Sequence, residues 1–280
     1  MTTLSREQIA TRLQHLPSLP QAVSELLSSF ADENVDIDRI ARLISHDQAL
    51  AARILRVANS SFYGLQHKVS TIQEAVVLLG FRAVRSMALA VGMHGTFNTE
   101  SCRSFDSRAY HRHCTAVGVT ARNLAAMAGI NRDLAFTAGL LHDIGRLALA
   151  ANFAVEYSEV LAYQRRHDCF LVVAERDVLG IDHAEIGGML AKAWHFPEAL
   201  HSAVVDHHAA AAAKADSLAN LVHVADVTAH ALGLENSGNE AVMPLDKTAW
   251  GRLGGDWLSL ARSLPQIQQD FAEANQTITA

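Results

Sequence analysis

The sequence predicts an all-α protein, and three observations support this fold class. Of the 280 residues, 50% are hydrophobic and only 19% are charged, which indicates an ordered chain with a large buried core. Alanine, the residue with the highest helix propensity, is abundant. Apolar residues recur at steps of three and four, as on one face of a helix, whereas no segment of useful length alternates apolar with polar residues as a strand does.

The first helices are predicted within the first 60 residues. Pro20 ends a turn-like Leu-Pro-Ser-Leu-Pro segment at residues 16–20 and suits the first turn of a helix with apolar residues up to Phe30. A second helix is predicted after Asp36, because an aspartate at the N-cap accepts hydrogen bonds from the first turn. A third helix carries apolar residues over 50–57.

Two more helices are predicted before residue 95. Thr71 precedes Glu74 by three residues, and this capping-box pattern predicts a helix start before the apolar run 75–79. Gly80 is predicted to end that helix. A further amphipathic helix is predicted through Leu89.

The second half of the chain is predicted to contain longer helices. The segment from His94 to Asp106 is polar and has little periodicity, so it predicts a connection between two helical lobes. The stretch over residues 235–255 is predicted to be rich in loops. Helical or continuously apolar patterns cover residues 110–127, 134–149, 155–166, 183–194, 218–232 and 256–280.

These patterns predict four parts of the chain. Residues 1–95 form an N-terminal helical lobe, and residues 96–106 form a linker. Residues 107–235 form a second lobe, which is a helical bundle. Residues 236–280 form a C-terminal extension, with a loop followed by a helix.

Composition and charge exclude several classes of protein. No apolar run reaches the roughly 18 residues of a membrane-spanning helix, and the N-terminal residues lack the apolar centre of a secretory signal. Three cysteines without Cys-x-x-Cys spacing predict neither a disulfide framework nor a thiolate zinc site. We therefore expect a cytoplasmic protein without a membrane segment. The net charge of -6 argues against a broad nucleic-acid surface.

Positive charge is concentrated in one part of the chain. Residues 39–112 hold 10 basic and 4 acidic side chains, although the net charge of the whole chain is -6. The pair Arg53 and Arg56 and the pair Arg82 and Arg85 are each spaced three residues apart, so each pair shares a helix face. These arginines are predicted either to be a solvated helix surface or to form a face that binds an anion or a partner protein.

Histidines and carboxylates form the most informative pattern. Of the 15 histidines, 11 lie between His111 and His230. Adjacent His142 and Asp143 lie in the apolar run Gly-Leu-Leu-His-Asp-Ile-Gly, where an ionised carboxylate is costly unless it is paired or bound to a metal. The residues predicted to bind metal are His113, His142, Asp143, His183, His207, His208 and Asp226.

The donor types narrow the kind of metal. Imidazole and carboxylate without thiolate suit Fe, Mn, Mg, Zn or Ni better than a structural cysteine-rich zinc site. Donors from several helices can hold one or two divalent ions, and two ions about 3.5–4 Å apart can activate water toward a phosphoester. The alternative is a metal-free network of buried polar groups bonded to one another. The other ten histidines, His230 among them, are predicted to be surface groups or satisfied core groups.

This series resembles the HD superfamily of metal-dependent phosphohydrolases. In that pattern His113 matches the leading histidine, His142 and Asp143 match the HD pair, and Asp226 matches the trailing aspartate. His183 and the His207-His208 pair match the additional histidines of the HD-GYP branch. The closer resemblance, over roughly residues 10–235, is to the HDOD domain, an output domain of bacterial signalling. Its hallmarks here are residues 16–20, 47–50, 53–60, 75–80, 140–145 and 182–184, Trp194, Pro197 and the His207-His208 pair.

The resemblance implies an HD-like second lobe and a role in bacterial signal transduction. The chain departs from active HD-GYP enzymes, because no Gly-Tyr-Pro follows His208 and Arg146 stands where the usual motif has lysine. These departures disfavour cyclic-di-GMP hydrolysis.

Two functions follow. In the first, preferred on the sequence, the protein is a signalling output module with a metal site that acts through a signalling protein partner or a nucleotide-like ligand. In the second, it is a phosphohydrolase acting on a nucleotide or cyclic nucleotide, with Asp143 and Arg146 as catalytic residues.

Overall fold

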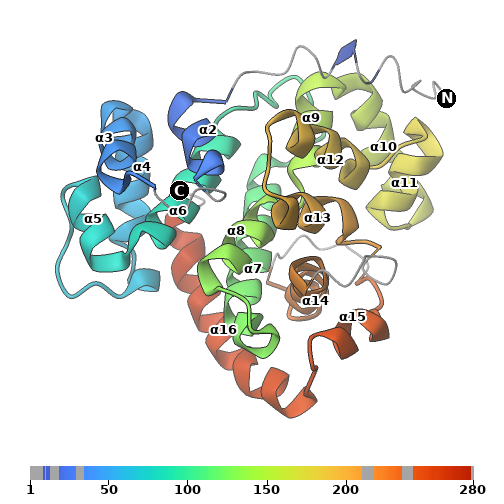
Figure 1. The fold of residues 1–280 in the computed structure, drawn as a ribbon. Helices are drawn as coiled ribbons and strands as arrows, with labels where there is room; N and C mark the ends of the chain where they lie inside the picture. The colour runs from blue at the N-terminus through green and yellow to red at the C-terminus, as the bar shows by residue number, and fades with distance from the viewer. Residues whose placement is uncertain are drawn as a thin grey trace.

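The computed structural model describes residues 19–29, 35–209, 217–234 and 242–278, together with Ile9, Thr11 and Arg12. Every regular element in these residues is an α-helix or a short 3-10 helix (Figure 1), so the predicted all-α class is confirmed. Residues 16–18 of the Leu-Pro-Ser-Leu-Pro segment and residues 210–213 of the alanine run lie outside the described residues.

Capping side chains determine where several helices of the predicted first lobe begin. Asp36 accepts a hydrogen bond from the backbone N–H of Arg39, and Thr71 and Glu74 form the predicted capping box. The helices of this part are α2 (Gln21–Ser28), α3 (Ile37–His46), α4 (Gln48–Ala58), the 3-10 helix η1 (Ser61–Tyr63), α5 (Ile72–Leu79) and α6 (Phe81–His94).

The rest of the chain also folds into helices. Residues 95–106 contain no helix. The following helices are α7 (Ser107–Leu124), η2 (Ala125–Ala128), α8 (Arg132–Leu141), α9 (Ile144–Asn152), α10 (Ala154–His167), α11 (Leu171–Leu179), α12 (His183–Ala193), α13 (Glu198–Asp206), α14 (Ser217–Ala231), α15 (Lys247–Arg252) and α16 (Trp257–Ile278).

The helices differ from the predicted ones in three respects. The apolar run 134–149 is divided into α8 and α9, because His142 and Asp143 lie in a turn between them. The stretch 235–255 is not only loop, since it contains α15. Helices α11 and α13, of 9 residues each, are not among the helices predicted from the sequence.

Helix α7 is the centre of the second part of the fold and packs against α8, α14 and α16. Two glycines allow α7 and α8 to approach at backbone contact: a Cβ atom on Gly139 would lie 2.6 Å from the Cα of Gly118. This close packing holds the C-terminal end of α8 against α7, and the His142-Asp143 pair follows directly after that end.

The two predicted lobes share one connected core. Helix α6 packs against α2, α4 and α5 and also contacts α8, where the Ser86 hydroxyl donates to the backbone oxygen of Asp133 at 2.9 Å. Helix α16 lies along α7 and contacts α4 and η1 (Figure 1), so the C-terminal extension packs against both lobes. The buried apolar residues of all these parts form a single cluster. The boundaries 1–95, 96–106, 107–235 and 236–280 stay a prediction.

One apolar segment bears on the expected absence of a membrane span. Among the described residues, Arg132–Asn152 alone is long and apolar enough by composition to cross a membrane. However, 83% of its most apolar window is buried inside the fold, which is typical of a core helix.

Candidate metal centre

The HD pair lies in a tight turn between two buried helices. The side chain of His142 contacts the last turn of α8, because its Nδ1 lies 2.7 Å from the backbone oxygen of Gly139. After Asp143 the chain turns directly into α9, and the exposed fractions of His142 and Asp143 are 1% and 3%. Close helix packing therefore removes both side chains from solvent and points them at the same interior space.

Four further segments bring the five other predicted donors to this space. His113 comes from the middle of α7, His183 is the first residue of α12, and Asp226 comes from α14. His207 and His208 directly follow α13. The structure therefore brings together all seven predicted metal ligands, although His113 and Asp226 are more than 100 positions apart in the chain.

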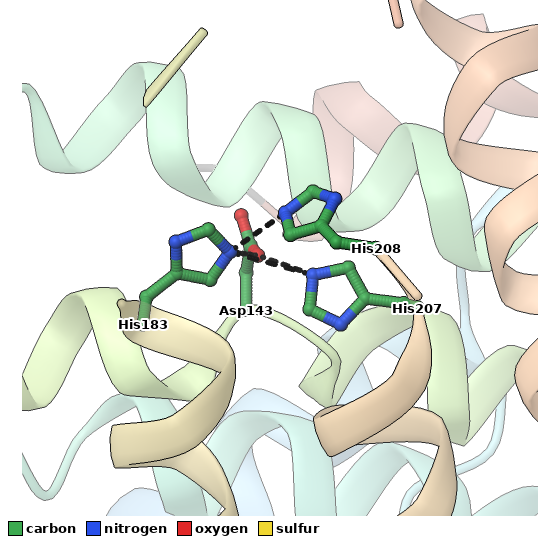
Figure 2. A group of neighbouring side chains, drawn as sticks. All are labelled: Asp143, His183, His207 and His208. Atoms are coloured by element: carbon green, nitrogen blue, oxygen red, sulfur yellow. Dashed lines mark hydrogen bonds and ion pairs between the residues drawn. The ribbon is translucent and has the colours of Figure 1, made fainter. Parts of the chain in front are cut away.

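The first donor group consists of Asp143, His183, His207 and His208. Figure 2 shows the three imidazole rings turned toward the Asp143 carboxylate. The Oδ1 atom of Asp143 lies 3.1 Å from Nε2 of His183 and 3.4 Å from Nε2 of His207. The Nε2 atoms of His183 and His208 are 2.9 Å apart. These four residues lie close enough together to hold a metal ion.

The second donor region surrounds the His113 ring. The Nε2 atom of His113 is 3.3 Å from Oδ2 of Asp143, 3.1 Å from Nε2 of His142 and 3.7 Å from Oδ1 of Asp226. His113, His142 and Asp143 form one potential metal-binding set, and His113, Asp226 and His230 form another. Asp143 thus contacts His142, His183 and His207 through Oδ1 and His113 through Oδ2.

The hydrogen bonds on the outer ring nitrogens show that these residues fit a cation. A backbone carbonyl can only accept a hydrogen bond. Because Nδ1 of His142 contacts the carbonyl of Gly139 and Nδ1 of His207 contacts that of Val204, both Nδ1 atoms carry a proton and donate it. In the neutral rings, Nε2 then carries a lone pair, and in both rings Nε2 faces the Asp143 carboxylate and another imidazole nitrogen. Converging lone pairs and carboxylate oxygens repel one another unless a proton or a metal ion lies among them.

Burial and neighbouring charges determine the ionisation of the inner donors. Burial opposes ionisation of Asp143, but His142, His183 and Arg146 outweigh burial and hold the pKa of this carboxyl well below its usual range. Burial lowers the pKa of His142 to about 3. Near neutral pH the centre therefore combines an ionised carboxylate with a neutral imidazole, which is the ionisation state that binds divalent cations.

His183 is the exception among these histidines. Burial disfavours its charged form, but Glu175 and Asp143 outweigh burial and raise the pKa of His183 to about 10. Glu175 is not among the predicted site residues, because it lies in a short helix and no motif marks it. Its Oε2 atom lies 2.6 Å from Nδ1 of His183.

His230 is also absent from the predicted set, but it lies in a potential metal-binding group with His113 and Asp226. Its Nδ1 atom lies 3.0 Å from Oδ1 of Asp226, and its ring centroid is 5.0 Å from that of His113. The sequence contains a signal for this placement, since His230 follows Asp226 by four residues and so shares its helix face.

A pocket of about 490 Å³, open mouth included, gives access to the cluster. One wall is polar and contains Arg146, whose Nη1 atom lies 2.9 Å from Oδ2 of Asp143. The apolar lining of the pocket includes Phe170, the N-cap of α11, and Leu171 and Val172 in the first turn of α11. The predicted catalytic residues Asp143 and Arg146 therefore both line the pocket.

The four arginines of the predicted anion or partner face do not form one cluster. Arg53 and Arg56 are exposed on α4, and the guanidinium of Arg53 lies beside Gly95 at the end of α6. Arg82 is exposed in the first turn of α6, about 20 Å away along the helix. Arg85 is half-buried and donates to the backbone oxygen of Ser29 at 3.1 Å. A partner face stays a prediction for Arg53 and Arg56.

Comparison with protein families matches residues 16–210 to the HDOD domain. The chain belongs to the HDOD domain family. The match to the HDOD domain contains every predicted metal ligand except Asp226, which lies beyond it on α14.

Solved structures of similar proteins share the whole fold. An HDOD domain protein of unknown function from Geobacter sulfurreducens is 25% identical, with a TM-score of 0.78 over 96% of this chain and 98% of that chain. A Shewanella amazonensis protein named "Putative phosphohydrolase" is 26% identical, with a TM-score of 0.78 over 96% and 97% of the two chains.

Sequence comparison also matches a relative that is longer than this chain. An uncharacterized protein of Treponema pallidum is 26% identical over 211 residues, which are 74% of this chain. This HDOD chain spans only 40% of the length of that relative.

Proposed function

We propose that this HDOD protein binds divalent metal at the histidine and aspartate cluster and hydrolyses a small phosphoester. The observation that carries the proposal is the convergence of two donor regions on Asp143 at the wall of an open pocket. The similarity over the whole chain to the Shewanella protein named as a phosphohydrolase also supports it.

The residues of the cluster divide into two sets for holding metal. Asp143 would serve both sets. Its Oδ1 atom lies near His183 and His207, and His208 lies beside His183. Its Oδ2 atom lies near His113, which lies beside Asp226. Divalent ions supply Lewis-acid chemistry at such sites, since they acidify water and polarise a phosphoester. The carbonyl contacts of Gly139 and Val204 hold two of the rings with Nε2 directed inward.

Arg146 and the apolar wall would bind the substrate itself. The Arg146 guanidinium has five donors in a planar fork, so it can keep its contact with Asp143 and still bind a phosphate oxygen. Phe170, Leu171 and Val172 form an apolar surface for the part of the substrate beyond the phosphate, and they exclude water from that side.

Metal analysis and turnover test this proposal together. Protein purified without chelators and reconstituted with Mn²⁺ or Fe²⁺ is expected to hold one or two ions per chain. It is expected to hydrolyse bis(p-nitrophenyl) phosphate or a nucleotide, with turnover removed by EDTA. Arg146→Ala is expected to lower kcat/KM by about 10²-fold through the lost phosphate contact, whereas Arg42→Ala, an exposed arginine of α3, serves as the matched control. Absence of metal after reconstitution contradicts the whole proposal.

A second candidate function is a signalling output module that binds a nucleotide-like ligand or a partner protein without turnover. Arg146 favours this candidate, because it already pairs with the Asp143 oxygen on the side of His113. The absence of Gly-Tyr-Pro after His208 favours it as well. Stoichiometric metal with saturable nucleotide binding and no product would support this candidate and refute hydrolysis.

Metal affinity is expected to depend strongly on pH. Because the pKa of His183 is raised to about 10, the metal-free protein carries a proton on His183 at neutral pH, and a metal ion must displace it. His142, with a pKa of about 3, does not compete in this range. The dissociation constant for Mn²⁺ should therefore rise as pH falls, by about tenfold per unit between pH 9 and pH 7. Calorimetry in buffers of different ionisation enthalpy should detect about one proton released per ion, and an affinity constant over this range would contradict the expectation.

A further inference from the structure

Glu175 is a fully buried carboxylate directly behind a proposed metal ligand. It lies on α11, its exposed fraction is 0%, and its Oε2 atom contacts His183 twice. That oxygen accepts a hydrogen bond from the backbone N–H of His183 at 2.9 Å and lies 2.6 Å from Nδ1 of the same residue. Glu175 therefore fixes both the backbone and the ring of His183.

Fold stability alone gives no reason for a carboxylate at this position. Removing a carboxylate from water is costly unless hydrogen bonds satisfy both oxygens, and Oε1 of Glu175 has no hydrogen-bond partner within the described part of the chain. A compensating factor is the N-terminus of α12, which begins at His183 and places a partial positive charge beside Oε2. All the identified partners of Glu175 thus belong to His183.

The hydrogen-bond partner of Nδ1 distinguishes His183 from two other proposed ligand histidines. The Nδ1 atoms of His142 and His207 both contact backbone carbonyls, which are neutral acceptors. Of these three histidines, His183 alone has a carboxylate at Nδ1 in the part of the chain that the structure describes. On its other side, Nε2 of His183 lies 3.1 Å from Asp143 and 2.9 Å from His208.

We propose that Glu175 is a positioning residue for the metal centre. It holds the proton on Nδ1 of His183, directs Nε2 toward Asp143 and His208, and supplies a negative charge that strengthens the bond from Nε2 to a divalent cation. This inference rests on the proposed metal site and adds a residue outside the set of direct ligands.

The substitution Glu175→Gln tests the charge while keeping the shape. The glutamine carbonyl oxygen can still accept from both donors of His183, so the ring stays in place and the negative charge is removed. We expect Mn²⁺ and Co²⁺ to bind the variant 10- to 100-fold more weakly than wild type. We also expect the visible spectrum of the Co²⁺-loaded protein to shift, which a purely structural role would not cause.

Asp182→Asn provides the matched control. Asp182 is the N-cap of α12 and pairs with Arg176, so the variant removes one buried negative charge next to His183. Asparagine is an equally good N-cap, and Asp182 is not hydrogen-bonded to the His183 ring in the structure. A general effect of charge would weaken metal binding equally in both variants, whereas direct positioning weakens it in Glu175→Gln.

The outcomes separate this inference from the proposed function. Equal metal affinity of wild type and Glu175→Gln, or equal losses in Glu175→Gln and Asp182→Asn, overturns the role of Glu175 and leaves the proposed function intact. Absence of metal in the wild type overturns both. Should Glu175→Gln fail to fold, ¹⁵N-histidine NMR of the metal-loaded wild type decides, because a metal bond at Nδ1 of His183 rather than Nε2 excludes the contact to Glu175.

Discussion

Asp143→Asn is expected to weaken divalent metal binding by at least about 100-fold and to remove phosphoester turnover. Loss of an outer-shell partner already weakens binding by about 10- to 100-fold, and the loss of a direct ligand should cost more. Asp143 contributes to both donor regions, with Oδ1 toward His183 and His207 and Oδ2 toward His113. Asparagine keeps the shape but removes the charge, and its amide nitrogen cannot bind a metal ion. One substitution should therefore affect every ion that the cluster holds.

Equilibrium dialysis followed by elemental analysis measures this loss, and thermal unfolding of the metal-free variant verifies that it folds. Asp206→Asn is a suitable control, because Asp206 directly precedes His207 but its carboxylate accepts from the Ser202 hydroxyl at 2.9 Å. Wild-type metal content in Asp143→Asn would show that Asp143 does not hold the bound metal.

Gly145→Ala is expected to have the largest effect on stability. Helices α9 and α12 cross at Gly145, where a Cβ atom would overlap the backbone oxygen of His183 and lie 2.7 Å from the backbone nitrogen of Gly187. Both obstacles are backbone atoms, so no side-chain rotation removes the clash. The loss should exceed about 3 kcal/mol, the upper end for ordinary overpacking. To relieve the clash, α12 would have to move away from α9, and this movement would carry His183 away from Asp143.

Thermal unfolding of metal-free protein tests this expectation. A loss of that size lowers the midpoint by at least about 6 °C in a protein of this length. The control is Gly251→Ala in α15, where an added Cβ meets no atom within 4 Å and the helix should gain up to about 1 kcal/mol. If Gly145→Ala melts within about a degree of wild type, α9 and α12 do not approach as the structure shows.

The sequence alone predicts the fold class and many helix starts, because these depend on local chemistry. Asp36 and the Thr71–Glu74 box act on their own first turns, so neighbouring residues are enough to indicate them. The donor set His113, His142, Asp143 and Asp226 is also predictable, because an HD pair inside an apolar run together with spaced histidines resembles a known family.

Only the tertiary structure shows which side chains meet. Glu175 appears in the sequence as an ordinary charged residue of a nine-residue helix, yet α11 packs on α10 and places it completely buried behind His183. His230 looks like one of many background histidines until α14 places it beside Asp226 and His113. Arg85 shares a helix face with Arg82, but its guanidinium donates to the backbone oxygen of Ser29, which directly follows α2, and this contact keeps Arg85 half-buried. Local sequence determines helix type and ends through hydrogen bonds a few residues long. The partners of a buried charge come from distant segments, so they are decided only when the helices pack.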